Sequence, residues 1–271
     1  MMKPNTIITQ LNFVTPDNSI KPRVTYSGTS EGQSYNDAYQ MKEVEITNAR
    51  SFPATFTLHE NGFEKTNHVL KKPNFDDEAW IKNVLYKEIQ AVIKKVSGAS
   101  DIFIFDHTIR RGIKNSLRKP AQHVHVDYTH NTGPDRAKQM IETADFKRLL
   151  GKRFIQVNFW RSINGPVEEM PLAFLDSKTL DEQDLVTAEI EFPDTDHLGE
   201  IYAVRKNKSQ RWYYYPDMQE DEALLIKGYD TQSDTASRFT PHSAFIDPTS
   251  NTHATPRQSI EVRTFAFFDE P

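Results

Sequence analysis

The stretch that decides the fold is QHVHVDY, residues 122–128. Its residues alternate, so that in an extended strand His123, His125 and Asp127 lie on one face and the residues between them lie on the other. The second face is apolar, because it carries two valines and a tyrosine. The stretch therefore predicts a β-strand with an apolar face that packs on a core and a second face of side chains that bind metal ions.

His125 and Asp127 place an imidazole and a carboxylate side by side on one surface. A second, distant histidine would complete the 2-His-1-carboxylate set that holds non-haem Fe(II). Such a histidine, His242, begins a strand-like segment in TPHSAF, residues 240–245. His123 shares the ligand face, and we interpret it as a structural residue beside the site rather than as a ligand.

Composition limits the classes of protein that the chain can form. Its 271 residues can form one large β-rich domain or two small ones, with one favoured, and a net charge of −5 with 37% hydrophobic and 26% charged residues is typical of a soluble globular protein. No long basic run marks nucleic acid as a partner. No apolar run approaches the roughly 18 residues of a membrane span and no signal-peptide pattern occurs, so we expect a cytoplasmic location. Cysteine is absent, which leaves histidine and carboxylates as metal ligands.

The periodicity along the chain predicts two helices and many short strands. One helix follows the capping sequence NFDD (residues 74–77), repeats apolar residues at helical spacing from Ile81 to Val96, and ends at Gly98. A second helix is predicted over residues 135–150. The strand candidates are residues 7–14, 44–46, 101–110, 154–161, 172–175, 187–192, 200–205, 211–215, 223–229, 242–246 and 259–268.

Short strands around a metal site, with helices outside them, indicate the fold class. We predict a mainly β fold with flanking helices and a double-stranded β-helix (jelly-roll) core. The whole chain, residues 1–271, is expected to form one domain. Residues 1–100 would supply an N-terminal extension and a covering helix, and residues 101–271 would supply the core.

The C-terminal strand carries a second polar pattern. Arg257 and Ser259 are two residues apart and share one face, so a guanidinium and a hydroxyl together offer a clamp for a carboxylate. Arg257 follows His242 by 15 residues (257 − 242), a distance that one hairpin can span. Glu261 and Arg263 lie on the same face, where they could form an ion pair.

Taken together, His-x-Asp, a distal histidine and Arg-x-Ser resemble the Fe(II)/2-oxoglutarate-dependent oxygenases. A closer resemblance covers roughly residues 100–268 and lies in the segments HVHVDYT, QVNFWR, PLAFLD, EALLIKGYD, TPHSAF and PRQSIEVR. These segments resemble the AsaB/CmcJ-like hydroxylase/desaturase family, which includes a fungal meroterpenoid endoperoxidase.

The resemblance implies roles for particular residues. It places His125, Asp127 and His242 on the iron ligands, and Arg257 and Ser259 on the clamp for the distal carboxylate of 2-oxoglutarate. Arg263 stays open as a rival anchor, because the 15-residue interval is longer than is usual in the wider superfamily. Asn158, in an otherwise apolar strand, either hydrogen-bonds the co-substrate or satisfies another buried amide.

The resemblance also implies an activity. It predicts a non-haem iron dioxygenase of secondary-metabolite biosynthesis that uses Fe(II), 2-oxoglutarate and O2. The substrate would be a small natural product such as a terpenoid, and the outcome would be hydroxylation, desaturation or endoperoxide formation. No catalytic residue beyond the metal ligands is implied, the substrate-binding residues stay unidentified, neither nucleic acid nor membrane is a partner, and a homodimer is allowed.

Two other functions fit the same ligand pattern. One is a non-catalytic jelly-roll protein that binds a ligand without turnover. The other is a cupin-type metal enzyme that needs no 2-oxoglutarate. Arg257 and Ser259 discriminate between these functions, because only the use of 2-oxoglutarate requires a carboxylate clamp at this place.

Overall fold

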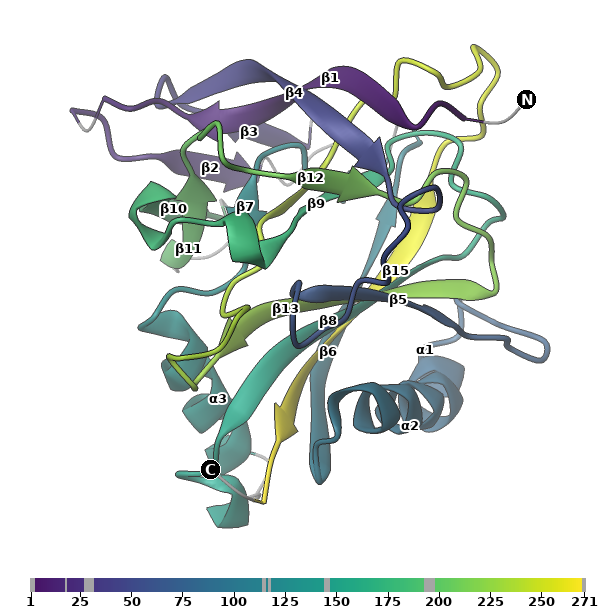
Figure 1. The fold of residues 1–271 in the computed structure, drawn as a ribbon. Coiled ribbons are helices and arrows are strands. Elements are labelled where there is room, and N and C mark those ends of the chain that lie inside the picture. The colour runs from purple at the N-terminus through teal and green to yellow at the C-terminus, as the bar shows by residue number, and fades with distance from the viewer. Residues whose placement is uncertain are drawn as a thin grey trace.

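The computed structural model describes residues 3–17, 19–26, 32–113, 116, 118–143, 147–192 and 198–269, and it contains two β-sheets that face each other. Figure 1 shows the larger sheet above the smaller one, with helices on the outside. The functional side chains predicted from the sequence lie on strands from both sheets.

The smaller sheet has five antiparallel strands. Their order is β5 (Phe63–Asn67), β13 (Glu222–Asp230), β8 (Phe154–Ser162), β15 (Gln258–Phe267) and β6 (Asp101–Arg111). Every residue of β8 and β13 is buried. Strands covered on both faces need apolar or internally bonded residues on both, so the polar residues that β8 carries must find partners inside the protein.

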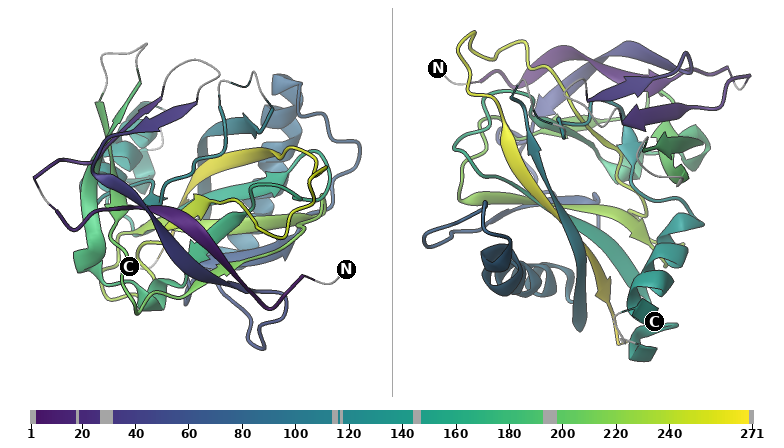
Figure 2. Two further views of the ribbon diagram at one scale, coloured as in Figure 1. Left: turned by 90° about the horizontal axis from the view of Figure 1, so that it is seen from above. Right: turned by 180° about the vertical axis from the view of Figure 1, so that it is seen from behind.

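The outer face of this sheet is covered by the first predicted helix. It begins as α1 (Glu78–Trp80), passes through a wider turn over Ile81–Leu85, and continues as α2 (Tyr86–Ser97). The Asp77 side chain caps its first turn, and Gly98 ends it in the left-handed conformation. Its apolar stripe packs on Val157, Phe159 and Val262 from β8 and β15. The predicted covering helix is confirmed (Figures 1 and 2).

The larger sheet has ten strands, and the N-terminal segment supplies four of them. Their order is β1 (Thr6–Val14), β4 (Tyr39–Asn48), β12 (Trp212–Tyr214), β9 (Leu172–Leu175), β14 (His242–Ala244), β7 (His125–Val126), β11 (Leu198–Val204), β10 (Leu185–Glu191), β2 (Arg23–Tyr26) and β3 (Gln33–Tyr35). Two of its pairings, β12 with β4 and β10 with β2, are parallel.

Strand β12 shows how the larger sheet is buried on both faces. Tyr213 packs toward Trp160 of the smaller sheet. Its neighbours Trp212 and Tyr214 point the other way and pack on Leu11 and Phe13 of β1. The N-terminal strands therefore cover a face that would otherwise be apolar and exposed (Figure 2).

The strand predicted over residues 122–128 is shorter than expected, since only His125–Val126 form β7. β7 lies between β11 and β14, and just before it the amide of Val124 donates to the carbonyl of Asn12 instead of to a neighbour in the ladder (2.9 Å). The alternation nevertheless holds around His125, because Val124 packs in the apolar cluster of β1 and β12, whereas His125 and Asp127 line a cavity with Trp160 of the smaller sheet.

The second predicted helix, over residues 135–150, is wrong in its bounds. Helix α3 spans Thr132–Thr143, a short 3-10 turn follows at Lys147–Leu149, and residues 144–146 lie outside the described part of the chain. The helix begins early because the Thr129 hydroxyl accepts the amides of Asn131 (3.2 Å) and Thr132 (3.1 Å) as a cap. Within the described ranges, no helix is both long and apolar enough to cross a membrane.

Candidate metal centre and carboxylate clamp

Three side chains predicted to bind metal meet between the two sheets. His125 and His242 are opposite each other on β7 and β14, and Asp127 follows β7. One ligand atom from each residue lies within 4.8 Å of the others. The His125 Nε2 atom is 3.6 Å from an Asp127 carboxylate oxygen, and the two imidazole centroids are 4.5 Å apart. The structure thus brings together residues that are 115 positions apart in the sequence (242 − 127).

Backbone carbonyls orient both imidazoles. The Nδ1 atom of His125 lies 2.8 Å from the carbonyl of His123, and the Nδ1 atom of His242 lies 3.0 Å from the carbonyl of Thr240. A carbonyl only accepts hydrogen bonds, so each Nδ1 carries the proton and each Nε2 offers a lone pair. Burial lowers the pKa of His125 to about 4, and His242 acts in the same direction. The His125 imidazole is therefore neutral near pH 7, and the neutral form is the one that binds metal.

A chain of amides from β8 holds the carboxylate. The Asn158 amide donates to Asp127, and the Gln156 amide donates to the Asn158 carbonyl oxygen (2.6 Å). Burial alone would raise the pKa of Asp127, but His242, His125 and Arg263 outweigh it and keep that pKa below its usual value. Asn158 thus has a partner in the protein, and its contact with a co-substrate stays a prediction.

The turn before His242 is fixed by a glycine on another segment. The Thr240 hydroxyl donates to the carbonyl of Gly62 (3.0 Å). Gly62 has a φ of +81°, and a Cβ atom there would lie 2.0 Å from the Thr240 hydroxyl oxygen and 2.3 Å from that of Ser177. Only glycine fits this close approach. The position of His242 therefore depends on a backbone conformation 180 residues away in the sequence (242 − 62).

The three ligand candidates share a narrow cavity with Arg257. The other side chains that line it are Arg110, Ala121, Trp160, Leu172, Ala244 and Glu261. The Arg257 guanidinium lies 5.3 Å from the centroid of the Trp160 ring and donates to the carbonyl of Met170. The walls of the cavity thus carry the metal-ligand candidates, two arginines and one further acid, together with apolar side chains.

Two polar atoms beside this cavity lack hydrogen-bond partners. Within the described residues, Arg257 Nε and the Ser259 hydroxyl are both buried and unpaired. Burial lowers the pKa of Arg257 to about 9, with a smaller contribution from Arg110. Buried donors without acceptors are costly, so the pair is suited to a carboxylate that comes from outside the chain.

The rival arginine is already engaged. Arg263 Nε donates to Asp106 (2.7 Å), and a second nitrogen donates to the Thr108 hydroxyl (3.2 Å). Burial alone would lower the pKa of Arg263, but Asp106 and Glu261 raise it above its usual value. Arg263 does not line the cavity. The ion pair considered between Glu261 and Arg263 does not form among the described residues, because Asp106 takes its place.

Sequence reasoning missed Arg110 and did not assign Glu261 to the cavity. Both line it, and both have a signal in the sequence. Asp106, Thr108 and Arg110 alternate along β6 in the same way as the polar residues of β15, and the two strands pair with Ser259 opposite Arg110. Matching these two polar stripes as neighbouring strands would have placed Arg110 beside the clamp.

His123 lies behind the metal-ligand candidates, as expected for a structural residue. Its ring stacks on that of His125 with centroids 4.3 Å apart, and Tyr35 and Tyr39 pack against it. Burial lowers the pKa of His123 well below its usual value, and His125 acts in the same direction. The neutral His123 ring stacks on the His125 ring and so limits rotation of the His125 side chain.

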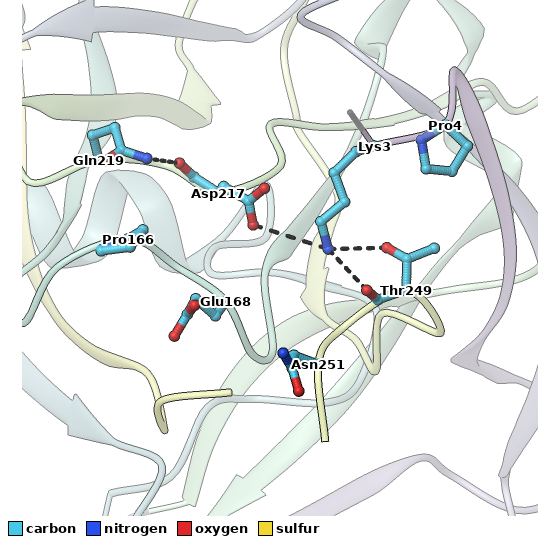
Figure 3. A pocket seen from close by; sticks show the side chains of 8 residues that line it. All are labelled: Lys3, Pro4, Pro166, Glu168, Asp217, Gln219, Thr249 and Asn251. Carbon is cyan, nitrogen blue, oxygen red and sulfur yellow. Dashed lines mark hydrogen bonds and ion pairs between the residues drawn. The ribbon is translucent and has the colours of Figure 1, made fainter. Parts of the chain in front are cut away.

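A wider groove lies elsewhere, beside the N-terminal segment (Figure 3). Lys3 reaches across it to the Thr249 hydroxyl (3.0 Å), to Asp247 (3.1 Å) and to Asp217 (3.9 Å). Lys3 thus contacts two other side chains of the groove, Thr249 and Asp217, and the groove shares no residue with the cavity of the metal-ligand candidates.

Comparison with known proteins agrees with this geometry. A family described as "Oxidoreductase/YMDC permease-like domain" matches residues 11–267, and the chain belongs to it. Hydroxylase/desaturase efuI of Hormonema carpetanum is 29% identical over 257 residues, which cover 86% of this chain and 85% of that protein. Hydroxylase/desaturase poxK of Penicillium oxalicum is 30% identical over 223 residues, with 73% and 69% covered.

A third relative links the sequence comparison to a solved structure. The Fe(II)/2-oxoglutarate-dependent dioxygenase nvfI of Aspergillus novofumigatus is 28% identical over 267 residues, which cover 95% of each chain. A structure of the iron and alpha-ketoglutarate-dependent endoperoxidase NvfI matches with a TM-score of 0.85 at 24% identity and covers 98% of this chain and 99% of its own. The predicted family, enzyme class and jelly-roll fold are confirmed.

Proposed function

We propose that His125, Asp127 and His242 hold Fe(II) and that Arg257, with Ser259, holds 2-oxoglutarate in an enzyme that oxidises a small natural product. One observation carries the proposal. A single cavity presents the three ligand candidates and a buried cation whose Nε has no partner within the described chain. Metal ligands and a carboxylate clamp are the two things that this chemistry requires.

The donor set suits iron. Two neutral imidazoles and one carboxylate are the ligands of non-haem Fe(II) oxygenases, and the set leaves positions for other ligands. Bound iron, together with 2-oxoglutarate, would supply the activation of O2 for attack on a C–H bond. The chain's own part is to hold the ligands, orient the co-substrate and keep water away.

The residues around the cavity divide these tasks. Arg257 would bind the distal carboxylate of the co-substrate, and Ser259 would donate one further hydrogen bond. The ring of Trp160 supports the guanidinium from one side. Ala121, Leu172 and Ala244 supply the apolar part of the wall.

The finer features are proposals of the same kind. The oxidation would be hydroxylation, desaturation or endoperoxide formation, and the relatives' names include hydroxylase/desaturase and endoperoxidase. The substrate would be a small natural product, met in the cytoplasm by one domain over residues 1–271. The carboxylate clamp favours this function over a ligand-binding protein or a metal enzyme that needs no co-substrate.

The metal part of the proposal is tested by metal binding. Mn(II) serves as the probe, because it takes the same ligand types and is not consumed by turnover. Changing His125, Asp127 or His242 to Ala should each weaken Mn(II) binding strongly and abolish succinate formation from 2-oxoglutarate. His107→Ala, which changes a histidine outside the cavity, is the matched control. Full metal binding by His242→Ala would show the ligand assignment to be wrong.

The co-substrate part is tested by comparing two arginines. Arg257→Ala should raise the apparent KM for 2-oxoglutarate much more than that for the organic substrate, because a lost buried charge pair costs roughly 2–5 kcal/mol. Arg263→Ala, which breaks the pair with Asp106, is the comparison. If only Arg263→Ala gave the selective effect, the clamp would belong to Arg263.

A further inference from the structure

Besides the metal-ligand candidates, which include Asp127, three charged side chains lie on the wall of the cavity: Arg110, Arg257 and Glu261. The strand register places them together. Arg110 on β6 is opposite Ser259 on β15, and Glu261 is two residues further along β15 on the same face. Glu261 is in turn opposite Trp160 on β8, whose ring supports Arg257. Two residues beyond Glu261, Arg263 is opposite Asn158, the partner of Asp127, so the acid lies between the clamp and the metal-ligand candidates along β15.

None of the three charges has an ion-pair partner within 4.0 Å among the residues that the structure describes. Arg110 donates to the carbonyl of Lys119 (3.1 Å), and Arg257 donates to the carbonyl of Met170. Carbonyls satisfy donors but do not neutralise a charge. Arg263 differs, because it is paired with Asp106 at 2.7 Å.

Arg110, Arg257 and Glu261 together carry a net charge of +1. Two guanidiniums and one carboxylate give +1, and the distal carboxylate of 2-oxoglutarate would bring the group to zero. The charges act on one another: Glu261 raises the pKa of Arg257, whereas Arg110 lowers it and burial lowers it most. In a buried site such charges interact over several ångströms with little screening.

We infer that Arg110 and Glu261 set the strength with which this cavity holds a dicarboxylate, with Arg110 strengthening and Glu261 weakening the attraction. The inference rests on the proposed clamp at Arg257. Glu261 has a use in this arrangement: the product of the reaction, succinate, is also a dicarboxylate and must leave. An acid beside the clamp keeps the cavity from holding the product too tightly.

The test measures binding of 2-oxoglutarate to the Mn(II)-loaded full-length protein by calorimetry. Glu261→Gln removes a charge with almost no change of shape, and it should tighten binding about tenfold, as expected for one charge at several ångströms in a partly buried site. Arg110→Gln should weaken binding about tenfold. The double variant should return to within about threefold of the wild type, because the two changes cancel.

A second ligand separates charge from shape. In 2-oxopentanoate a methyl group replaces the distal carboxylate, so Glu261→Gln and Arg110→Gln should change its affinity much less than they change that of 2-oxoglutarate. Succinate release from the wild type should be faster than from Glu261→Gln. Arg110→Lys, which keeps the positive charge, should bind 2-oxoglutarate like the wild type. If Arg110→Gln does not fold, the result for Glu261→Gln decides whether the inference holds.

The outcomes distinguish this inference from the proposed function. Weaker or unchanged binding of 2-oxoglutarate by Glu261→Gln overturns the inference, since the acid would then only position Arg257 or contact the organic substrate. If the wild type bound 2-oxoglutarate no better than 2-oxopentanoate, or if Arg257→Ala left both affinities unchanged, the clamp itself would fail.

Discussion

Asn158 contacts Asp127 directly, and its one hydrogen bond to that carboxylate fixes the direction in which Asp127 faces the cavity. We expect Asn158→Leu, which keeps the size and removes the donor, to weaken Mn(II) binding roughly 10–100-fold, as is usual when the partner of a metal ligand is lost. Calorimetric titration with Mn(II) measures the effect. Gln156→Met, one step further from Asp127, should weaken binding less, and equal losses in the two variants would count against a direct role for Asn158.

The metal-ligand candidates were predictable at the residue scale, but their supports were not. His125 and Asp127 are marked by alternation within seven residues, and His242 by the start of a strand. The pairing of Asn158 with Asp127 depends on which face of β8 meets β7 across two sheets. Polar residues on a buried strand indicate that hydrogen-bond partners are present, but the tertiary packing decides which residues those partners are.

At the scale of elements, the Glu222 side chain at the start of β13 connects this strand to β5 and to the segment that follows β4. Its buried carboxylate pairs with Arg50 through both oxygens, with Lys65 (2.9 Å), and with the amide of Gln219 (3.0 Å). Burial alone would raise the pKa of Glu222, but the hydrogen bonds from Arg50 and Lys65 outweigh it and lower that pKa to about 2. A group of this kind stabilises the fold above its unfolded-state pKa, about 4.5, and the stabilisation is lost as the pH falls toward 2.

The wild type and Glu222→Gln should differ in how the free energy of unfolding depends on pH below about 5. Glu222→Gln should lower the free energy of unfolding by about 2 kcal/mol at neutral pH, because the partly exposed cations Arg50 and Lys65 lose their charged partner. Between pH 5 and 2 the wild type should lose this advantage, so the two curves should converge. Urea denaturation at a series of pH values gives the curves, with Glu142→Gln on the surface of α3 as the control. Parallel curves down to pH 2 would rule out the role given to Glu222.

Elements with a local signal were predicted well. The core strands of both sheets lie close to their expected ranges, since side-chain alternation is a property of each strand alone. The partners of the N-terminal strands could not be predicted. β4 pairs with β12 and β2 pairs with β10 in parallel, and a parallel pairing between distant segments leaves no turn sequence that marks it. β7 was overestimated because alternation continues beyond the two residues that form ladder bonds.

For the whole molecule, the N-terminal strands are part of the core. Leu11 and Phe13 of β1 are fully buried against Trp212 and Tyr214, and burial of each is worth about 2 kcal/mol. Deleting residues 1–15 should therefore prevent stable folding, whereas deleting residues 1–4 removes the ion pair of Lys3 with the buried Asp247 carboxylate and should cost only about 1–3 kcal/mol. Thermal unfolding by circular dichroism compares the two. A cooperative transition at the wild-type temperature in the longer deletion would show β1 to be dispensable.

Gly62 limits how this protein can change over evolution or in a directed library. Its neighbours leave no room for a methyl group, and the turn that it supports carries His242. Ala121 and Leu172 line the cavity, where a different side chain would change the space that is left for a substrate. A side chain at position 62 would clash with Thr240 and Ser177, although Gly62 does not line the cavity. When every position is randomised and variants are selected for activity, glycine should be retained there as strictly as the metal-ligand candidates, so retention at this position will report geometry and not chemistry.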